Sequence, residues 1–449
     1  MQFDQFKHVY WVRLSASVDV VRLLITQGLA FRGHDESKSS LSKGSFLQIL
    51  SWYAKKCDKI RDYVLEHAPQ NEQMTSPMIQ KDIVSACKIE TIKDILEELN
   101  GDYFSLLVDE SFDVSRKEQM AIVLRYIDRN GFVMERLLDI VHVQDTSALS
   151  LKRAIVNLLA QHSLSLSHVR GKCYEGASNM QGITNELNKC LQKKEQDLAN
   201  AMLLVEVAKR RLQAYRDDGW NSLIAKVSLF CIKHEFLIPN FEDPYVSSLR
   251  SRRRLGDNKV SHHYHVEVFC NIIDWQLQEL KDRFGEATTD LLRGIACLNP
   301  IDSFSSFDIR KIMKMAKLYP DDFNEFNMGT LENQLASYII DVRDVDERFL
   351  NLKGLCDLSK RLVQTKKHSN YPLVFYLVKL ALLLPVSTAS VERAFSAMKF
   401  IKNDLRSQMS DDFFSGCLVP YLEKDVFDNV SNDAIIKTFQ AMKARRVQL

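Results

Sequence analysis

The sequence predicts an α+β fold that is mostly helical and has one small sheet in the first half of the chain. Three observations lead to this prediction. Apolar residues recur at helical spacing over most of the 449 residues. Between about residues 103 and 173 the spacing shortens to that of β-strands. Only 15 Gly and 9 Pro occur, which favours long helices and few loops.

The overall composition is typical of a soluble globular protein, with 46% hydrophobic and 26% charged residues. The net charge of +2 means that any nucleic-acid binding must come from a local basic patch. The longest apolar run, 371–386, contains Lys379 and is too short to span a bilayer, and the N-terminus has no apolar signal-peptide core. We therefore expect no membrane partner.

The cysteines indicate the compartment. Nine Cys are scattered along the chain without a Cys-x-x-Cys pair. This pattern is typical of reduced thiols in a nuclear or cytosolic protein and not of a disulfide framework. Phosphate-loop, dinucleotide-binding and Gly-x-Ser-x-Gly motifs do not occur in the sequence, so we expect no small-molecule substrate.

The first hundred residues are predicted to be helical. Residues 18–25 are mostly apolar and are followed by Gly28 and Gly33, which are suitable helix stops. After a Ser-rich loop, the ranges 46–64 and 79–99 show apolar residues at helical spacing.

Strands follow in the range 103–173. Residues 103–108 form an apolar run, and the next two β-rich runs are separated by Asn130 and Gly131, which is a hairpin signal. A helix at 147–164 then leads to a short strand at 168–173. Three hairpin-like strands, a helix and a fourth strand are the opening order of a ribonuclease-H-like fold.

This order predicts how the strands pair. We expect 103–108 to be central, with 118–128 on one side and a parallel strand at 168–173 on the other. The strand at 131–143 should pair outside 118–128.

The second half of the chain is predicted to be almost wholly helical. A long helix should contain Leu198, Val205 and Leu212 on one stripe, and 236–262 should be a loop. Further helices are predicted at 264–283, 288–297, 307–318, 331–342, 352–365, 372–384, 390–409 and 411–423.

Three acidic residues lie at positions that suit a metal ligand. Asp109 ends the first strand, Glu175 follows the fourth, and Glu392 lies in the first turn of the helix that begins near residue 390. A carboxylate at the end of a buried strand is rigidly held and suits a metal ion. Each acid also has an ordinary interpretation: a solvated loop acid for Asp109 and Glu175, and a partner of the helix dipole for Glu392.

One basic cluster occurs, consisting of Arg250, Arg252, Arg253 and Arg254 on a loop with Pro239 and Pro244 upstream. Such a loop either is simply solvated or neutralises several phosphates of a nucleic acid.

Several segments resemble a known family. The segments at 24–50, at 106–128 (LLVDESFDVSRKEQMAIVLRYID) and at 173–182 (CYEGASNMQG) are similar to the region of unknown function in hAT-derived proteins of the zinc-finger MYM-type group. The tail at 380–427, with its SVERAFS core, resembles the hAT C-terminal dimerisation region. The likeness extends from about residue 20 to the end.

The resemblance implies a transposase core of ribonuclease-H type, interrupted by a helical insertion, with an acidic triad that maps onto Asp109, Glu175 and Glu392. In the family this triad holds two divalent metals, Mg or Mn, which activate the attacking oxygen and stabilise the leaving one. It also implies a homodimer, nuclear location and DNA as a partner. For the dimer surface we predict Phe413, Phe414 and Leu418.

The sequence departs from the family in three respects. The middle acid, normally Asp, is Glu175, and its extra methylene moves the carboxylate by roughly an ångström, which can cost about 100-fold in rate. The strand expected after NELNKCLQ is missing, since the chain passes directly into KKEQDLANAM. A zinc finger ahead of the core, which reads DNA in the family, has no counterpart in this sequence.

We therefore predict four regions: N-terminal helices at 1–100, the first part of a truncated ribonuclease-H-like core at 101–190, a helical insertion at 191–350, and a dimerisation region at 351–449 that completes the core. The favoured function is a domesticated or degenerate hAT transposase-like protein that dimerises, with DNA as a partner and without transposition. One alternative is an active metal-dependent DDE-type DNA transposase. The other is a purely structural helical interaction protein.

Overall fold

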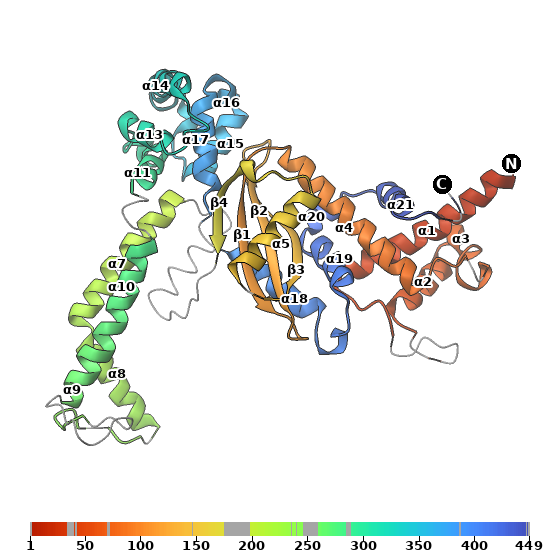
Figure 1. The fold of residues 1–449 in the computed structure, drawn as a ribbon, viewed down its shortest axis with the longest axis horizontal. Coiled ribbons are helices and arrows are strands. Elements are labelled where there is room, and N and C mark those ends of the chain that lie inside the picture. The colour runs from red at the N-terminus through yellow and green to blue at the C-terminus, as the bar shows by residue number, and fades with distance from the viewer. Residues whose placement is uncertain are drawn as a thin grey trace. The chain divides into compact units, whose positions relative to one another are not determined.

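The structure is a computed structural model, and it confirms a mostly helical α+β fold with one small mixed sheet (Figure 1). It describes all residues except 1, 34–39, 41–42, 70–71, 146, 175–197, 235, 239, 246–258, 284–288, 386–387, 446 and 448–449. None of the described helices is both long and apolar enough to cross a membrane.

The chain forms two compact units. The first, here called the sheet unit, contains residues 1–176 and 382–449, and the second, the helical unit, contains residues 177–381. The N-terminal helices and the C-terminal tail thus belong to the same unit as the sheet. These two units divide the chain differently from the four predicted regions, because residues 1–100 share one core with the strands and residues 351–381 group with the helical unit.

The sheet has the predicted order. Its four described strands run β3-β2-β1-β4, with β1 antiparallel to β2 and parallel to β4. Their bounds are β1 Phe104–Phe112, β2 Glu118–Ile127, β3 Val133–Val143 and β4 Val169–Tyr174. Gly131, with a φ of 83°, lies in the turn of the β2–β3 hairpin, and α5 (Ala148–Gln161) leads back to β4.

Helices of both chain ends share one unit with this sheet. The N-terminal part supplies α1 (Gln2–Thr26), α2 (Ser45–Lys56), α3 (Asp58–Arg61) and α4 (Pro77–Leu99). The C-terminal part supplies α18 (Ala389–Ile401), α19 (Asp411–Leu422), α20 (Lys424–Phe427) and α21 (Asn432–Ala441). Helices α4 and α19 pack side by side, and apolar residues of both ends join the strands in one core (Figure 1).

The helical unit contains a long helix α7 (Leu198–Asp218), then α8 (Trp220–Lys233), and after the loop α9 (Val260–His262), a π-helical turn (His263–Cys270) and α10 (Asn271–Arg283). Its remaining larger helices are α11 (Thr289–Leu298), α13 (Ile309–Ala316), α14 (Glu325–Ile339), α15 (Leu355–Gln364) and α17 (Pro372–Leu383). As predicted, Val205 and Leu212 are buried on the stripe of α7, and they contact α10 residues such as Ile273 and Leu277.

One predicted helix is shorter than expected. The helix predicted at 390–409 ends at Ile401, and Leu405 lies on a separate 3-10 turn (Asp404–Arg406) with its side chain 96% exposed. Val391, Phe395, Met398 and Ile401 are buried, as predicted, because α18 packs against the sheet. Helical spacing continues in the sequence beyond residue 401, but this tertiary contact does not.

Candidate functional site

Asp109 lies on the central strand β1, opposite Ala121 of β2, and is half-buried. Its Oδ1 accepts a hydrogen bond of 2.8 Å from the backbone N–H of Glu110. Since side chains alternate along a strand, Asp109 faces the same side of the sheet as Ser105, whose partner in the register is Arg125.

That side of the sheet is covered by α18. Arg125 donates from Nε to the carbonyl of Leu382 at 2.8 Å and pairs with Glu135 of β3 at 2.6 Å. Glu135 in turn accepts a hydrogen bond from the hydroxyl of Ser390 at the start of α18. The helix therefore begins over the sheet face on which Asp109 lies.

Glu392 follows Ser390 by two residues, in the first turn of α18, and is half-buried. Its backbone N–H donates to the carbonyl of Thr388 at 3.0 Å. Asp109 and Glu392, 283 residues apart in sequence (392 − 109), are thus carried by elements in contact on one side of the sheet. Their convergence to metal-binding distance stays a prediction.

The third acid, Glu175, and the four arginines at 250 and 252–254 lie outside the described residues. Within the part of the chain that the structure describes, no group of three or more His, Cys, Asp or Glu side chains forms a metal-binding cluster. A three-carboxylate site therefore depends on where Glu175 lies.

Glu110, next to Asp109, points to the opposite side of the sheet. Burial raises the pKa of its carboxyl above the ordinary value, and the nearby charge of Glu118 raises it further. This acid therefore takes up a proton more readily than a solvated glutamate.

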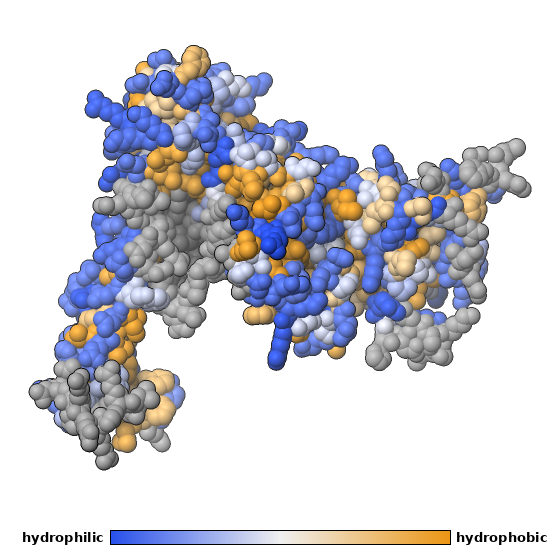
Figure 2. Space-filling view, in the orientation of Figure 1, coloured by the Kyte–Doolittle hydropathy of each residue, from blue (hydrophilic) through white to orange (hydrophobic). Residues whose placement is uncertain are grey.

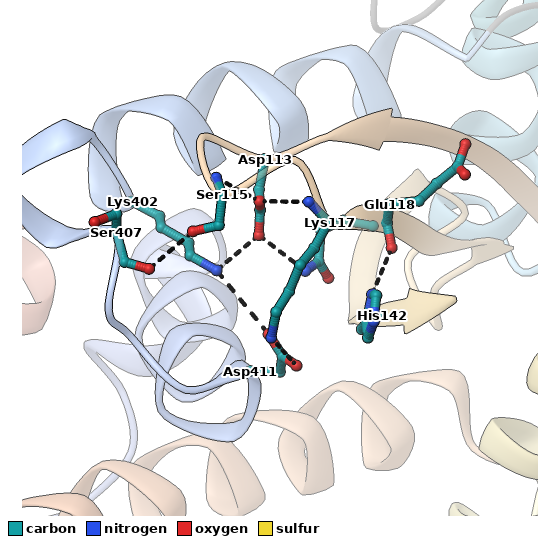
Figure 3. A network of polar contacts seen from close by, with 9 residues as sticks. Asp113, Ser115, Lys117, Glu118, His142, Lys402, Ser407 and Asp411 are labelled. Carbon is teal, nitrogen blue, oxygen red and sulfur yellow. Dashed lines mark hydrogen bonds and ion pairs between the residues drawn. The ribbon is translucent and has the colours of Figure 1, made fainter. Parts of the chain in front are cut away.

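Asp113, which directly follows β1, has a different environment from Asp109 and Glu110. Its Oδ2 lies 2.6 Å from the Nζ of Lys402, and both side chains are 0% exposed (Figure 3). Gln119 donates to the same oxygen at 3.1 Å, and Oδ1 accepts from the backbone N–H groups of Ser115 and Lys117. Asp113 is therefore fully engaged in a structural ion pair.

Burial alone would raise the pKa of Asp113, but hydrogen bonds from Lys402, from the backbone of Lys117 and from Gln119 outweigh it and lower that pKa. Asp113 is thus held as a carboxylate, and it fixes the end of α18 to the β1–β2 hairpin.

Two further contacts tie the hairpin to the segment after α18 (Figure 3). The hydroxyl of Ser115 donates to the carbonyl of Ser407 at 2.8 Å, and Lys117 pairs with Asp411 at 3.0 Å. Sequence reasoning missed this network. The one signal was Lys402, a cation directly after the apolar end of a helix, but nothing local identified a partner 289 residues away.

The predicted dimerisation residues need correction. Phe414 and Leu418 are fully buried in the core of the sheet unit, where α19 packs on α4, so they are not available on the surface of this chain. Phe413 is half-buried and its ring meets that of Phe31 edge to face at 5.3 Å. The spacing of the apolar residues at 413, 414 and 418 predicts one apolar helix face. It does not predict whether that face packs inside the chain or against a partner.

A recess of about 560 Å³ lies beside Phe413. The end of α1 and the following loop form one wall, with Leu24, Gly28 and Phe31, and the segment 401–417 forms the other. Arg406 bridges the two walls by donating to the carbonyls of Gly28 at 2.8 Å and Phe400 at 3.0 Å. Leu405, which also lines the recess, is therefore exposed on an anchored turn.

Comparison with known families gives two matches. Residues 1–186 match the family described as ZMYM1/FAM200, RNase-like domain. Residues 356–426 match the hAT family C-terminal dimerisation region. The first match contains β1 to β4 and Asp109, and the second contains α18, Glu392, Leu405 and the segment that lines the recess.

Proposed function

We propose that this chain, a hAT-derived, transposase-like protein, acts as a homodimeric, DNA-associated nuclear protein that does not itself transpose DNA. The observation that carries the proposal is the exposed, anchored turn at Leu405 inside the dimerisation region, next to an apolar recess.

The turn and the recess supply the two parts of a self-complementary contact. Leu405 has an apolar side chain in water, and Arg406 holds its backbone against α1, so little conformational entropy is lost when a partner covers it. The recess is lined mainly by apolar groups, including Leu24, Phe31 and Met409. In a two-fold dimer, Leu405 of each copy would enter the recess of the other.

Sedimentation velocity of the full chain tests the dimer. Leu405→Glu should shift the particle toward a smaller mass, because the new charge would be buried without a partner. The control is Leu149→Glu, since Leu149 is an exposed leucine outside the dimerisation region, on α5. A Leu405→Glu protein with unchanged mass would contradict the role of this turn.

DNA association rests on Arg250, Arg252, Arg253 and Arg254, since the net charge of +2 offers no general attraction. DNA binding by this cluster should weaken steeply as the salt concentration rises. Each arginine removed should reduce the slope of the logarithm of the binding constant against the logarithm of the salt concentration by about one. Binding that does not depend on salt, or equal binding by a variant with all four arginines changed to Ser, would contradict the role of this cluster, and no DNA binding at all would favour the structural interaction protein.

The absence of transposition rests on Glu175 in place of Asp. Asp109 and Glu392 supply carboxylate oxygens, which Mg²⁺ and Mn²⁺ prefer, on one side of the sheet, and so fit two ligands of the ancestral site. Bound metals would activate a water or hydroxyl and stabilise the leaving oxygen. The role of the chain would be to hold the three carboxylates, and the side chain of Glu175 is one methylene longer than the Asp it replaces.

A nicking assay on DNA with Mg²⁺ or Mn²⁺ tests this part. Wild type should cut no faster than Asp109→Ala, whereas Glu175→Asp should be the variant that gains activity. Asp109→Ala should also weaken Mn²⁺ binding in a titration followed by electron paramagnetic resonance. Metal-dependent nicking by wild type that Asp109→Ala abolishes would support the second candidate function, an active DDE-type transposase.

A further inference from the structure

The helical unit carries an apolar surface on α8 that the proposed function does not use. Helix α8 has the sequence WNSLIAKVSLFCIK, with apolar residues around most of its circumference. A helix of this kind is normally buried. Yet none of its 14 residues, all of which the structure describes, is buried in this chain.

The polar groups of α8 leave two apolar faces open. Lys226 and Lys233 are seven residues apart and share one narrow strip of the helix with Ser222, while Asn221 and Ser228, also seven apart, form a second. Leu229 and Ile232, three residues apart, form an outer apolar face. Leu223 and Val227 lie on the other face, which borders a recess.

This recess has a volume of about 720 Å³ and lies between α7, α8 and the helical segment from Tyr264 to Gln276. Its lining is mainly apolar and aromatic, and includes Trp220, Phe269 and Ile272. Tyr215 and Phe269 meet edge to face at 5.4 Å, and Trp220 lies 5.6 Å from Phe269, so the walls are held by ring packing.

An aromatic group projects from the end of α8. The ring of Phe230 lies 4.4 Å from that of His234 and stacks with that of Phe236 at 6.3 Å. The backbone N–H of Phe236 donates to the carbonyl of Cys231 at 2.9 Å, which closes the helix end. Leu237, directly after it, is 97% exposed. This apolar end is therefore fixed in position.

The exposed surface is large enough for a stable interface. Its exposed apolar side chains are Val227, Leu229, Phe230, Ile232, Phe236, Leu237, Ile238, Tyr264, Val266, Ile272 and Trp275. At roughly 100 Å² each they expose on the order of 1,000 Å², compared with about 800 Å² per partner in a standard interface. Figure 2 shows hydrophobic residues gathered over these helices.

We propose that this surface, from α7 to α10 around α8, is a second self-association surface, on which the apolar end of α8 from another copy of the chain fills the recess. The surface offers both halves of such a contact, since α8 lines the recess and Phe236 and Leu237 project from the segment directly after α8. A two-fold axis beside α8 brings each projection to the other recess.

A second copy fits this surface better than a lipid membrane does. A helix that lies in a membrane interface presents a broad polar face to water, whereas the polar residues of α8 form two narrow strips. A concave recess is also filled by shaped side chains and not by a flat bilayer.

Two separate two-fold surfaces, at α8 and at Leu405, build a tetramer or a longer assembly. The tests are Leu237→Glu for the α8 surface and Leu405→Glu for the tail, in the full chain. Both side chains are almost fully exposed, 97% and 96%, so neither change disturbs the fold of the single chain. Circular dichroism checks this.

Sedimentation velocity should give a tetramer or larger for wild type, a dimer for each single variant, and a monomer for the double variant. A Leu405→Glu chain that is already a monomer overturns the α8 proposal and leaves the tail dimer intact. A Leu237→Glu chain that is a monomer overturns the tail dimer instead. A wild type that is monomeric, alone or bound to anionic phospholipid vesicles, overturns both.

Leu229→Glu and Leu149→Glu form a matched pair, because both leucines lie on helices and are 67% and 66% exposed. Only Leu229→Glu, the change on α8, should reduce the mass of the sedimenting assembly. Alkylation of Cys231, which lines the recess, should be slower in wild type than in Leu237→Glu, and this readout is independent of mass. Equal rates of alkylation would mean that no second copy covers the recess.

Discussion

The Nζ of Lys402 and the Oδ2 of Asp113 are 2.6 Å apart, with neither side chain exposed to solvent. This pair joins the last residues of α18 to the β1–β2 hairpin, 289 residues earlier in the chain. The position of α18, and with it that of Glu392, therefore depends on a buried charge pair at the far end of the helix.

Removing one partner of this ion pair should destabilise the folded chain. Lys402→Met leaves the Asp113 carboxylate buried without its cation, and we expect the free energy of unfolding to fall by about 3–5 kcal/mol. Urea denaturation measures it. The control is Lys117→Met, since the partly exposed pair of Lys117 with Asp411 should contribute less than about 1 kcal/mol. Similar losses in the two variants would contradict the assigned role of Lys402.

The same pair predicts a dependence on pH. Because the pKa of Asp113 is lowered in the folded chain, its contribution to stability is complete above the unfolded pKa of about 3.9 and is lost as the pH falls through the folded value. Asp113→Asn lacks this contribution. The difference in unfolding free energy between wild type and Asp113→Asn should therefore narrow as the pH falls below 4, roughly the unfolded value. A difference that stays constant well below pH 4, roughly the unfolded value, or that already narrows above it, would argue against a depressed pKa.

Gly416 marks a close approach of α19 to α4. A Cβ at this position would lie 2.7 Å from Cγ1 of the buried Val84, so Gly416→Ala should destabilise by about 1–3 kcal/mol despite the helix preference of Ala. Gly329→Ala is the control, because no atom lies within 4 Å of its added Cβ, and it should stabilise α14 by about 0.5–1 kcal/mol. Val84→Ala should rescue Gly416→Ala in a double-mutant cycle, and additive effects would mean that the contact is absent.

Substitutions of core residues and of surface residues in the tail should have different effects on stability and on self-association. Phe414→Ala should lower the free energy of unfolding by about 3–5 kcal/mol, since it leaves a cavity in the core. Leu405→Ala should change it by less than about 0.5 kcal/mol, since Leu405 touches solvent, yet weaken self-association. Thermal unfolding of dilute protein and sedimentation give the two readouts. A Phe414→Ala chain that folds as stably as wild type would mean that Phe414 is not a core residue.

The amino-acid sequence alone predicts much of the sheet. Strand order and the parallel pairing of β1 with β4 followed from the Asn130–Gly131 turn and from the handedness of the return through α5, which are local and general rules. It also determined the helix faces, since Val391, Phe395 and Met398 recur at helical spacing and are buried.

What each apolar face contacts, and which charges pair, is seen only in the folded chain. Phe414 and Leu405 are both apolar residues of one tail, but one fills the core and the other is exposed. Asp109 lies within β1 and Asp113 directly follows it, but only Asp113 is paired with Lys402. The physical reason is distance along the chain. Periodicity and turn chemistry act over a few residues, whereas burial and ion pairing depend on segments that folding brings together across hundreds of residues.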